Sequence, residues 1–160
     1  MKVDIIDFKI LKELQLNSKI TNIELSKKIG LSAAPTLGRV QKLEKNGIIN
    51  SYHAKINASK LGLGLIALIN VSLAKQVGNS VDKFVQKIID LEEVIECFQL
   101  TGNFDYQLKV MVKDINSFEQ FIANKLNDLD EIGQINTSII LSSIKQTPLI
   151  PIDYKSDVYL

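Results

Sequence analysis

One short run of residues, Gly102-Asn103-Phe104-Asp105, has the types and spacing needed to bind a small charged molecule. A glycine turn exposes backbone N–H groups that can bind a carboxylate. The Asp105 side chain offers a negative charge for an amino group. A free amino acid carries both charges, so it would match this turn. An aspartate beside a turn glycine can also serve only to hold the backbone, and that structural role stays open.

A second group of candidate binding residues lies on a predicted helix that follows Ser32. Small residues at the tip of such a helix let the backbone approach a groove of duplex DNA, and basic residues further along can contact phosphate. The candidate DNA contacts are Ser32, Ala33, Ala34, Thr36, Arg39 and Lys42. We assign Arg39 and Lys42 mainly to phosphate and expect Ala33, Ala34 and Thr36 nearer the base edges. An ion pair from Arg39 to Glu44 or to a neighbouring helix is the alternative.

Residues that commonly do catalysis or bind metals are scarce. The only cysteine, Cys97, and the only histidine, His53, lie forty-four positions apart. This excludes an internal disulfide and lacks the ligand spacing of a zinc site. We therefore expect no catalytic residue, no metal site and no cofactor. Cys97 is expected to be a buried thiol and His53 to be exposed to solvent.

The first fifty residues contain the helix signals that position the second group. Apolar residues about four apart predict a first helix over residues 4–17. Thr21 and Glu24 match a capping box that starts a second helix. Gly30 fits the left-handed residue that ends it, and Ser32 fits the N-cap of the third helix. Two helices joined so closely cross steeply, which is typical of a helix-turn-helix whose second helix enters the major groove.

The inward face of the third helix and the charge of the segment refine this prediction. Leu37, Val40 and Leu43 are expected to face inward. Residues 1–57 carry ten Lys and Arg against five Asp and Glu, whereas residues 58–160 carry nine against thirteen. The positive first segment is therefore suited to a polyanion. A helical hairpin that does not bind DNA stays an alternative, because lysine-rich helices are often simply solvated.

The rest of the chain predicts an extended connector and an α+β domain. Residues 48–57 alternate as a strand that leaves the first domain. Strand, helix, strand, strand, helix and strand then follow over 63–73, 81–88, 94–101, 104–113, 118–129 and 134–144. This order is a ferredoxin-like βαββαβ unit, an antiparallel sheet with helices on one side.

A sheet covered on one side needs a partner for its other face. We expect that open face to carry Ile69, Val71, Leu108, Val110, Ile139 and Leu141. Such a face is too apolar for water, which predicts a homodimer. The longest nearly apolar run, residues 61–74, is too short for a membrane helix, and no secretory signal precedes it. We therefore expect a cytoplasmic protein with no membrane partner.

Two motifs make the chain resemble the Lrp/AsnC (leucine-responsive, feast/famine) transcription regulators. The first runs from residue 21 to 32 as TNIELSKKIGLS and continues with Arg39-Val40, Leu43-Glu44 and Gly47-Ile48-Ile49. The second is Glu96-Cys97 followed by Gly102-Asn103-Phe104-Asp105-Tyr106. The resemblance covers about residues 4–146. Gly38 and Gln41 depart from the family pattern, and these departures concern which operator is bound.

The resemblance implies a (winged) helix-turn-helix domain over residues 1–57, a ferredoxin-like effector-binding and oligomerisation domain over 58–146, and a tail over 147–160. Its implied partners are double-stranded DNA and a small effector, an amino acid. A homodimer would assemble further to a tetramer, octamer or higher. The effector pocket would lie between dimers and use the turn and the last strand, with candidates Gly102, Asn103, Asp105, Thr137, Ser138 and Ile140.

Two other functions and the role of the tail stay open. Some proteins of this architecture resemble haem-pathway decarboxylases, which need histidine and arginine near a tetrapyrrole. This chain has only His53 and Arg39, both in the first domain. A metabolite-binding adaptor without specific DNA readout is the third candidate, because of Gly38 and Gln41. The proline-containing tail is expected to be disordered or to pack against a neighbouring subunit.

Overall fold

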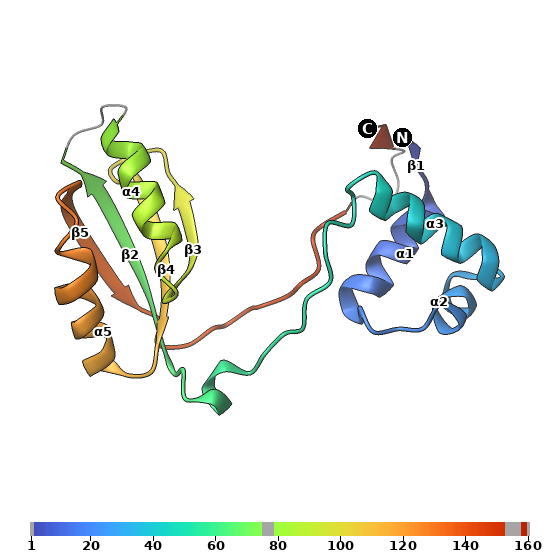
Figure 1. The fold of residues 1–160 in the computed structure, drawn as a ribbon. Coiled ribbons are helices and arrows are strands. Elements are labelled where there is room, and N and C mark those ends of the chain that lie inside the picture. The colour runs from blue at the N-terminus through green and yellow to red at the C-terminus, as the bar shows by residue number, and fades with distance from the viewer. Residues whose placement is uncertain (1, 75–78, 153–157, 160) are drawn as a thin grey trace. The chain divides into compact units, whose positions relative to one another are not determined.

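The computed structural model describes residues 2–74, 79–152 and 158–159, and the chain divides into two compact units (Figure 1). The first unit contains Met1–Lys55 together with Lys145–Leu160, and the second contains Ile56–Ile144. Among the described residues, no helix is long and apolar enough to cross a membrane.

Three helices form the first unit, as the sequence predicts. They are α1 (Ile5–Leu16), α2 (Asn22–Ile29) and α3 (Ala33–Lys45). Their shared core contains the buried side chains Ile10, Leu25, Ile29 and Leu43. Removing these side chains from water supplies most of the stabilisation of such a small unit.

Local hydrogen bonds fix where these helices start. The Asp4 carboxylate accepts hydrogen bonds of 2.9 Å from the backbone N–H groups of Ile6 and Asp7. At α2, the Glu24 N–H donates to Thr21 Oγ1 at 3.2 Å and the Thr21 N–H donates to Glu24 Oε2 at 3.1 Å. The predicted capping box at Thr21 is therefore confirmed, and Asp4 with Asp7 forms another at α1.

The C-terminal tail belongs to the first unit. Strand β6 (Val158–Tyr159) pairs antiparallel with β1 (Lys2–Val3), and the Ile150 N–H donates to Gln15 Oε1 at 2.9 Å. Residues 153–157 and 160 lie outside the described residues. The expectation of disorder is therefore wrong for the described part of the tail, which packs on its own chain.

The connector between the units differs from its predicted strand. The only regular element described between α3 and the sheet is a short 3₁₀ helix, η1 (Ala58–Leu61), and residues 51–57 form no strand in the described chain. Alternation predicts an extended backbone, but a strand also needs a hydrogen-bonding neighbour. Within the described part of one chain, this segment has none.

The second unit has the predicted ferredoxin-like topology. Its four strands lie in the order β3-β4-β2-β5 and all neighbours are antiparallel. Helices cover one face of this sheet (Figure 1). The elements in chain order are β2 (Leu65–Leu73), α4 (Asn79–Ile89), β3 (Val94–Gln99), β4 (Tyr106–Val112), α5 (Ile115–Phe121), a π-helical turn η2 (Ile122–Leu126) and β5 (Ile132–Ile139).

The prediction of which side chains occupy the open face of the sheet is wrong. Ile69, Val71, Leu108 and Val110 are all fully buried, in the core that includes Phe84 of α4. The open face instead carries their neighbours in sequence. Ile139, the last residue of β5, and Leu141, which follows the strand, are exposed. The open face pairs Ile66 with Met111, Leu68 with Lys109, and Asn70 with Gln107. Alternation shows which residues share a face, but not which face the helices cover.

The expectation of a buried Cys97 thiol is also wrong. Cys97 lies on β3, which is an edge strand, and the residue is exposed. Its partial burial still raises the pKa of the thiol. An edge strand lacks a neighbour on one side, so an apolar sequence there does not ensure burial.

Candidate nucleic-acid interface and ligand turn

The turn between α2 and α3 has the backbone geometry of a helix-turn-helix. Gly30 ends α2 with φ 77° and ψ 34°, a left-handed conformation that glycine adopts without steric cost. The Leu31 N–H donates to the Ser26 carbonyl at 3.0 Å. The Asn22 amide then donates to the Ala33 carbonyl at 2.8 Å, which ties the start of α2 to the start of α3.

The structure corrects the rotation of α3 about its axis. Thr36 is 0% exposed, and its hydroxyl donates to the Ser32 carbonyl at 2.9 Å. Leu37, expected to face inward, is 47% exposed. The assignment of Thr36 to the base edges is therefore wrong. Burial of a threonine is inexpensive here, because the hydroxyl finds a partner in its own helix and the methyl group packs inward.

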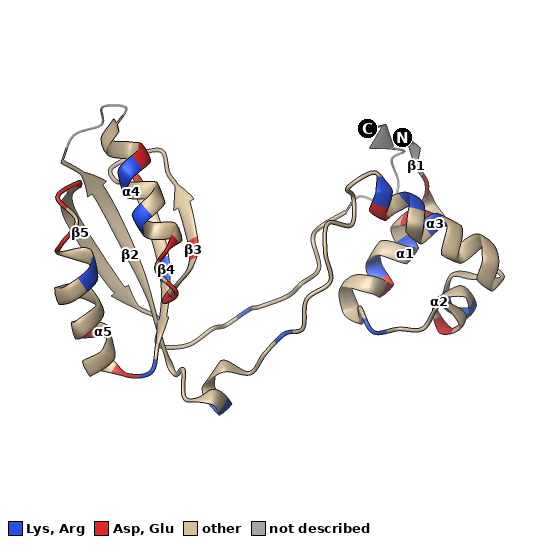
Figure 2. Cartoon of the chain, in the orientation of Figure 1, with Lys and Arg blue, Asp and Glu red and all other residues tan. Residues whose placement is uncertain are grey.

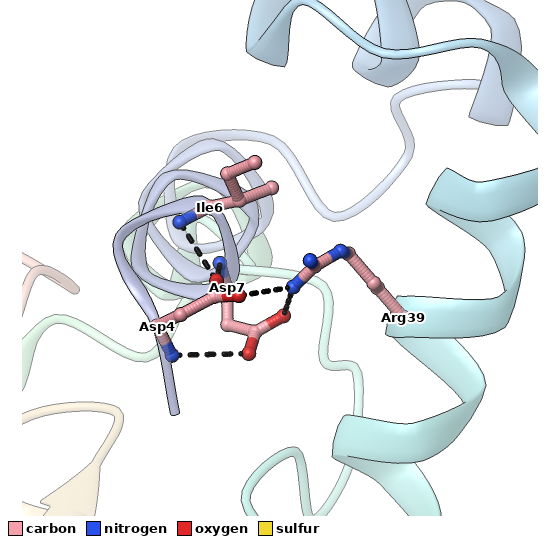
Figure 3. Close-up of polar contacts among 4 residues, drawn as sticks. All are labelled: Asp4, Ile6, Asp7 and Arg39. Carbon is pink, nitrogen blue, oxygen red and sulfur yellow. Dashed lines mark hydrogen bonds and ion pairs between the residues drawn. The ribbon is translucent and has the colours of Figure 1, made fainter. Parts of the chain in front are cut away.

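Arg39 has two carboxylate partners at the start of α1, the N-cap residue Asp4 and Asp7 of the first turn (Figure 3). One terminal guanidinium nitrogen, Nη1, lies 2.8 Å from Asp4 Oδ2 and 2.7 Å from Asp7 Oδ1. The Arg39 side chain is 32% exposed, and that of Asp7 is buried. The sequence left open an ion pair from Arg39 to a neighbouring helix, and the structure has this ion pair. Arg39 therefore joins α3 to α1. Its contact with phosphate stays a prediction.

The contact between Asp4 and Arg39 shifts the pKa values of these two groups in the expected directions. Burial raises the pKa of Asp4, but hydrogen bonds from the Asp7 N–H and from Arg39 lower it by more, so the net pKa is below its usual value. Hydrogen bonds to Asp7 and Asp4 raise the pKa of Arg39. Both shifts favour the charged forms of Asp4 and Arg39.

The other candidates on α3 differ in their access to solvent. Ser32, Ala34 and Lys42 are exposed, whereas Ala33 is half-buried. Ser32 occupies the predicted N-cap position, yet its side chain forms no cap hydrogen bond. The other exposed residues of α3 were not among the candidate DNA contacts; they are Pro35, Leu37, Gly38, Gln41, Glu44 and Lys45. The exposure of Leu37 could be predicted only if the rotation of α3 about its axis were already known.

The ligand turn is tied to the end of β2. Gly102 has a positive φ of 115°, as a tight turn requires. The Asp105 N–H donates to the Val71 carbonyl at 2.9 Å, and the Leu73 N–H donates to Asp105 Oδ2 at 2.8 Å. The Ser72 hydroxyl donates to the Asn103 carbonyl at 3.3 Å. Asp105 thus stabilises a register irregularity between Ser72 and Leu73.

The candidates on the last strand do not gather around this turn within one chain. Thr137 pairs with Ile69 and Ser138 with Leu68, while the Ile140 N–H donates to the Ile66 carbonyl. These positions run from the middle of β2 toward the end opposite the turn. The β5 residue beside the turn is Gln134, opposite Ser72. Each residue advances a strand by about 3.3 Å, so the candidates on β5 are separated from the turn along the length of the strand.

Metal chemistry has no site in the described chain. No group of three or more His, Cys, Asp or Glu side chains there could hold a metal ion.

Comparison with protein families matches both units. A model described as winged helix-turn-helix DNA-binding matches residues 3–50, and a model described as the Lrp/AsnC ligand binding domain matches residues 66–150. A leucine-responsive regulatory protein from Haemophilus influenzae is 39% identical, covering 91% of this chain and 87% of the relative. The Bkd operon transcriptional regulator of Pseudomonas aeruginosa is 36% identical, covering 89% and 94%.

Solved structures agree with these matches. A transcriptional regulator of Neisseria meningitidis in complex with L-methionine has a TM-score of 0.88 and 36% identity, covering 91% of this chain and 94% of that one. AsnC of Escherichia coli has a TM-score of 0.79 and 28% identity, covering 95% and 98%. Both similarities extend over the two units.

Proposed function

The chain belongs to the Lrp/AsnC family of DNA-binding transcription regulators, and we propose that residues 1–57 bind duplex DNA through α3 while residues 58–146 bind a free amino acid. The observation that carries the proposal is the matched pair of units: a helix-turn-helix with an exposed α3 face and a ferredoxin-like unit with a glycine turn. Binding of the effector changes DNA binding or assembly. Because the DNA of bacteria and archaea lies in the cytoplasm, the regulator acts there.

DNA binding is assigned to the exposed side of α3 and its preceding turn. The N-terminal end of the second helix of such a motif enters the major groove. Ser32 and Ala34 are exposed at that end, and Lys42 is exposed two turns later. We assign Ser32 and Lys42 to phosphate, with Ala33 and Ala34 close to the groove floor because they are small.

An amino acid is the favoured effector. The turn around Gly102 and Asn103 supplies backbone N–H groups for a carboxylate, and the Neisseria relative was solved with L-methionine. Since Thr137, Ser138 and Ile140 lie away from this turn in one chain, we infer that a pocket using both sets is completed by a second subunit.

The effector is identified by thermal unfolding of the protein with each of the twenty amino acids. A ligand at 100 times its Kd stabilises the folded protein by about 2.7 kcal/mol, so one or a few amino acids should raise the Tm by several degrees. The same ligands should change the affinity for the protein's own upstream DNA in a retardation assay. No shift with any amino acid would contradict the amino-acid proposal and leave the DNA-binding assignment intact.

Assembly through the open sheet face is proposed from its side chains. Ile66, Leu68 and Met111 form an apolar patch on that face, and Phe98 of β3 is exposed. A second copy packed on this face would bury them and give a homodimer, which then assembles to a tetramer, octamer or higher.

Leu68→Lys is expected to dissociate this homodimer, because it adds a second positive charge beside Lys109 on the face that the second copy would cover. Sedimentation equilibrium should show more monomer, with the Kd of the dimer raised by at least about tenfold. The matched control is Ile89→Lys, which changes an exposed apolar residue at the end of α4 and should leave assembly unchanged. Dissociation by the control alone would contradict the proposed face.

The alternative functions differ in their support. The relatives are named transcription regulators, so the tetrapyrrole decarboxylase is set aside and the protein is not an enzyme. An adaptor without specific DNA readout would bind all duplexes equally. Enrichment of particular sequences from a random DNA pool therefore separates a regulator from an adaptor.

A further inference from the structure

The outward face of α3 has an unusual composition for a DNA-reading helix. Its exposed residues over the first two turns are Ala34, Pro35, Leu37 and Gly38, and the next exposed position is Gln41. No charged residue occurs in α3 before Arg39, as Figure 2 shows. The charged residues that follow are Arg39, Lys42, Glu44 and Lys45.

Arg39 is not directed outward with the others. Its Nη1 is shared by Asp4 and Asp7 of the α1 start at 2.8 and 2.7 Å (Figure 3). Arginine bidentate to guanine is the commonest specific contact in the major groove. The only arginine of the chain is therefore paired with two carboxylates of the protein, and the exposed side chains of α3 ahead of Lys42 favour bases other than guanine.

We propose that Leu37 and Gln41 are the residues that determine operator specificity, with a thymine methyl group opposite Leu37 and an adenine edge opposite Gln41. This rests on the proposed function, in which α3 enters the major groove. The operator half-site then contains thymine and adenine at these two positions, and Lys42 and Lys45 bind the flanking phosphates without reading sequence.

The chemistry of the base edges selects these partners. Leucine has no donor or acceptor, and the C5 methyl of thymine is the apolar group that a base pair presents in the major groove. Opposite guanine or cytosine, Leu37 would remove hydrogen-bonding groups from water without replacing their partners. The Gln41 amide has one donor and one acceptor side, which match N7 and N6–H of adenine.

The spacing of the two residues fits base pairs that lie about two steps apart in the duplex. Positions four apart lie on one side of a helix, about 6 Å along its axis, which spans about two base pairs. Gly38 lies beside both. A Cβ added at Gly38 would meet nothing within 4 Å, so internal packing does not require glycine there. The missing side chain leaves room for α3 to approach the bases.

Chemical modification of DNA tests each contact one atom group at a time. The full-length protein selects its preferred sites from random duplexes. Each thymine of the selected site is then replaced by deoxyuridine, which removes only the methyl group, and each adenine by 7-deazaadenine, which removes N7. At one thymine of the site, replacement by deoxyuridine should weaken binding about three- to fivefold. At one adenine, replacement by 7-deazaadenine should weaken binding about five- to tenfold.

The variants Leu37→Ala and Gln41→Ala assign these losses to residues. Leu37→Ala should abolish the deoxyuridine effect and keep the 7-deazaadenine effect, and Gln41→Ala should do the reverse. Lys45→Ala is the control, expected to weaken binding to every duplex and to keep both effects. All three positions are exposed, so unchanged thermal unfolding checks that the variants are folded.

Two results would overturn the assignment. If both modified-base effects persist in Leu37→Ala and Gln41→Ala, other residues read the operator. If selected sites carry only guanine and cytosine under α3, the base assignment is wrong. A selection that enriches no sequence at all would instead contradict the proposed function itself, because the protein would then lack specific DNA readout.

Discussion

Replacement of Arg39 by alanine is expected to lower the free energy of unfolding of the first unit by about 2 to 3 kcal/mol, because it leaves the buried Asp7 carboxylate without its cation. This cost is smaller than that of breaking a fully buried ion pair, because the Arg39 side chain is 32% exposed. DNA affinity should fall on all sequences, because α3 loses a contact that fixes it against α1. This makes Arg39 a positioning residue.

The dependence of DNA affinity on salt separates positioning from phosphate contact. Each phosphate contact contributes about 0.9 to the slope of log K against log salt concentration. Arg39→Ala should keep the slope of the unmodified protein and lower the Tm. Lys42→Ala, the matched control on an exposed position, should lower the slope by about 0.9 and leave the Tm unchanged. A reduced slope with an unchanged Tm for Arg39→Ala would restore the assignment of Arg39 to phosphate.

Local signals explain why the helices of the first unit were predictable. The Thr21 and Glu24 capping box and the left-handed Gly30 depend on residues within one helical turn of each other. Their hydrogen bonds are the same in almost any fold. The strand and helix order of the second unit was predictable for a similar reason, because periods of 2 and 3.6 residues are properties of each segment.

Orientation relative to neighbours was not predictable in the same way. Leu37 and Thr36 both continue the apolar spacing of Val40 and Leu43, and the choice between them depends on how α3 packs against the other helices. The pairing of Arg39 with Asp4 and Asp7 joins residues more than thirty positions apart. Hydrophobicity predicts that Leu37 is buried and Thr36 exposed, but the structure has the reverse. Thr36 can be buried because its hydroxyl donates to the Ser32 carbonyl.

The same limit applies to the ligand turn. Sequence places Asp105 after Gly102 and suggests a charge for a ligand, but the contact with the Leu73 N–H joins residues thirty-two positions apart. Asp105 thus has a structural partner as well as a proposed ligand. The two roles depend on different properties of the side chain: a backbone N–H needs one acceptor oxygen, whereas a ligand amino group gains most from the negative charge.

Asp105→Asn is expected to separate these two roles. Asparagine keeps an oxygen that can accept from the Leu73 N–H, so the Tm without effector should change little. The loss of charge should weaken the amino-acid effector by about 10- to 100-fold, which corresponds to a charged hydrogen bond of about 1.5 to 3 kcal/mol. Isothermal titration calorimetry with the amino acid identified by thermal unfolding measures this change.

Asp105→Ala completes the comparison, because it removes the charge and the acceptor together. The part-buried Leu73 N–H then loses its partner, which should cost about 1 to 2 kcal/mol of stability in addition to the loss of effector affinity. Asp128→Asn, an exposed carboxylate of the same unit, is the charge-matched control and should bind effector normally. If Asp105→Asn also binds normally while Asp105→Ala is destabilised, Asp105 only anchors the backbone, and the ligand amino group must find its anion elsewhere in the assembly.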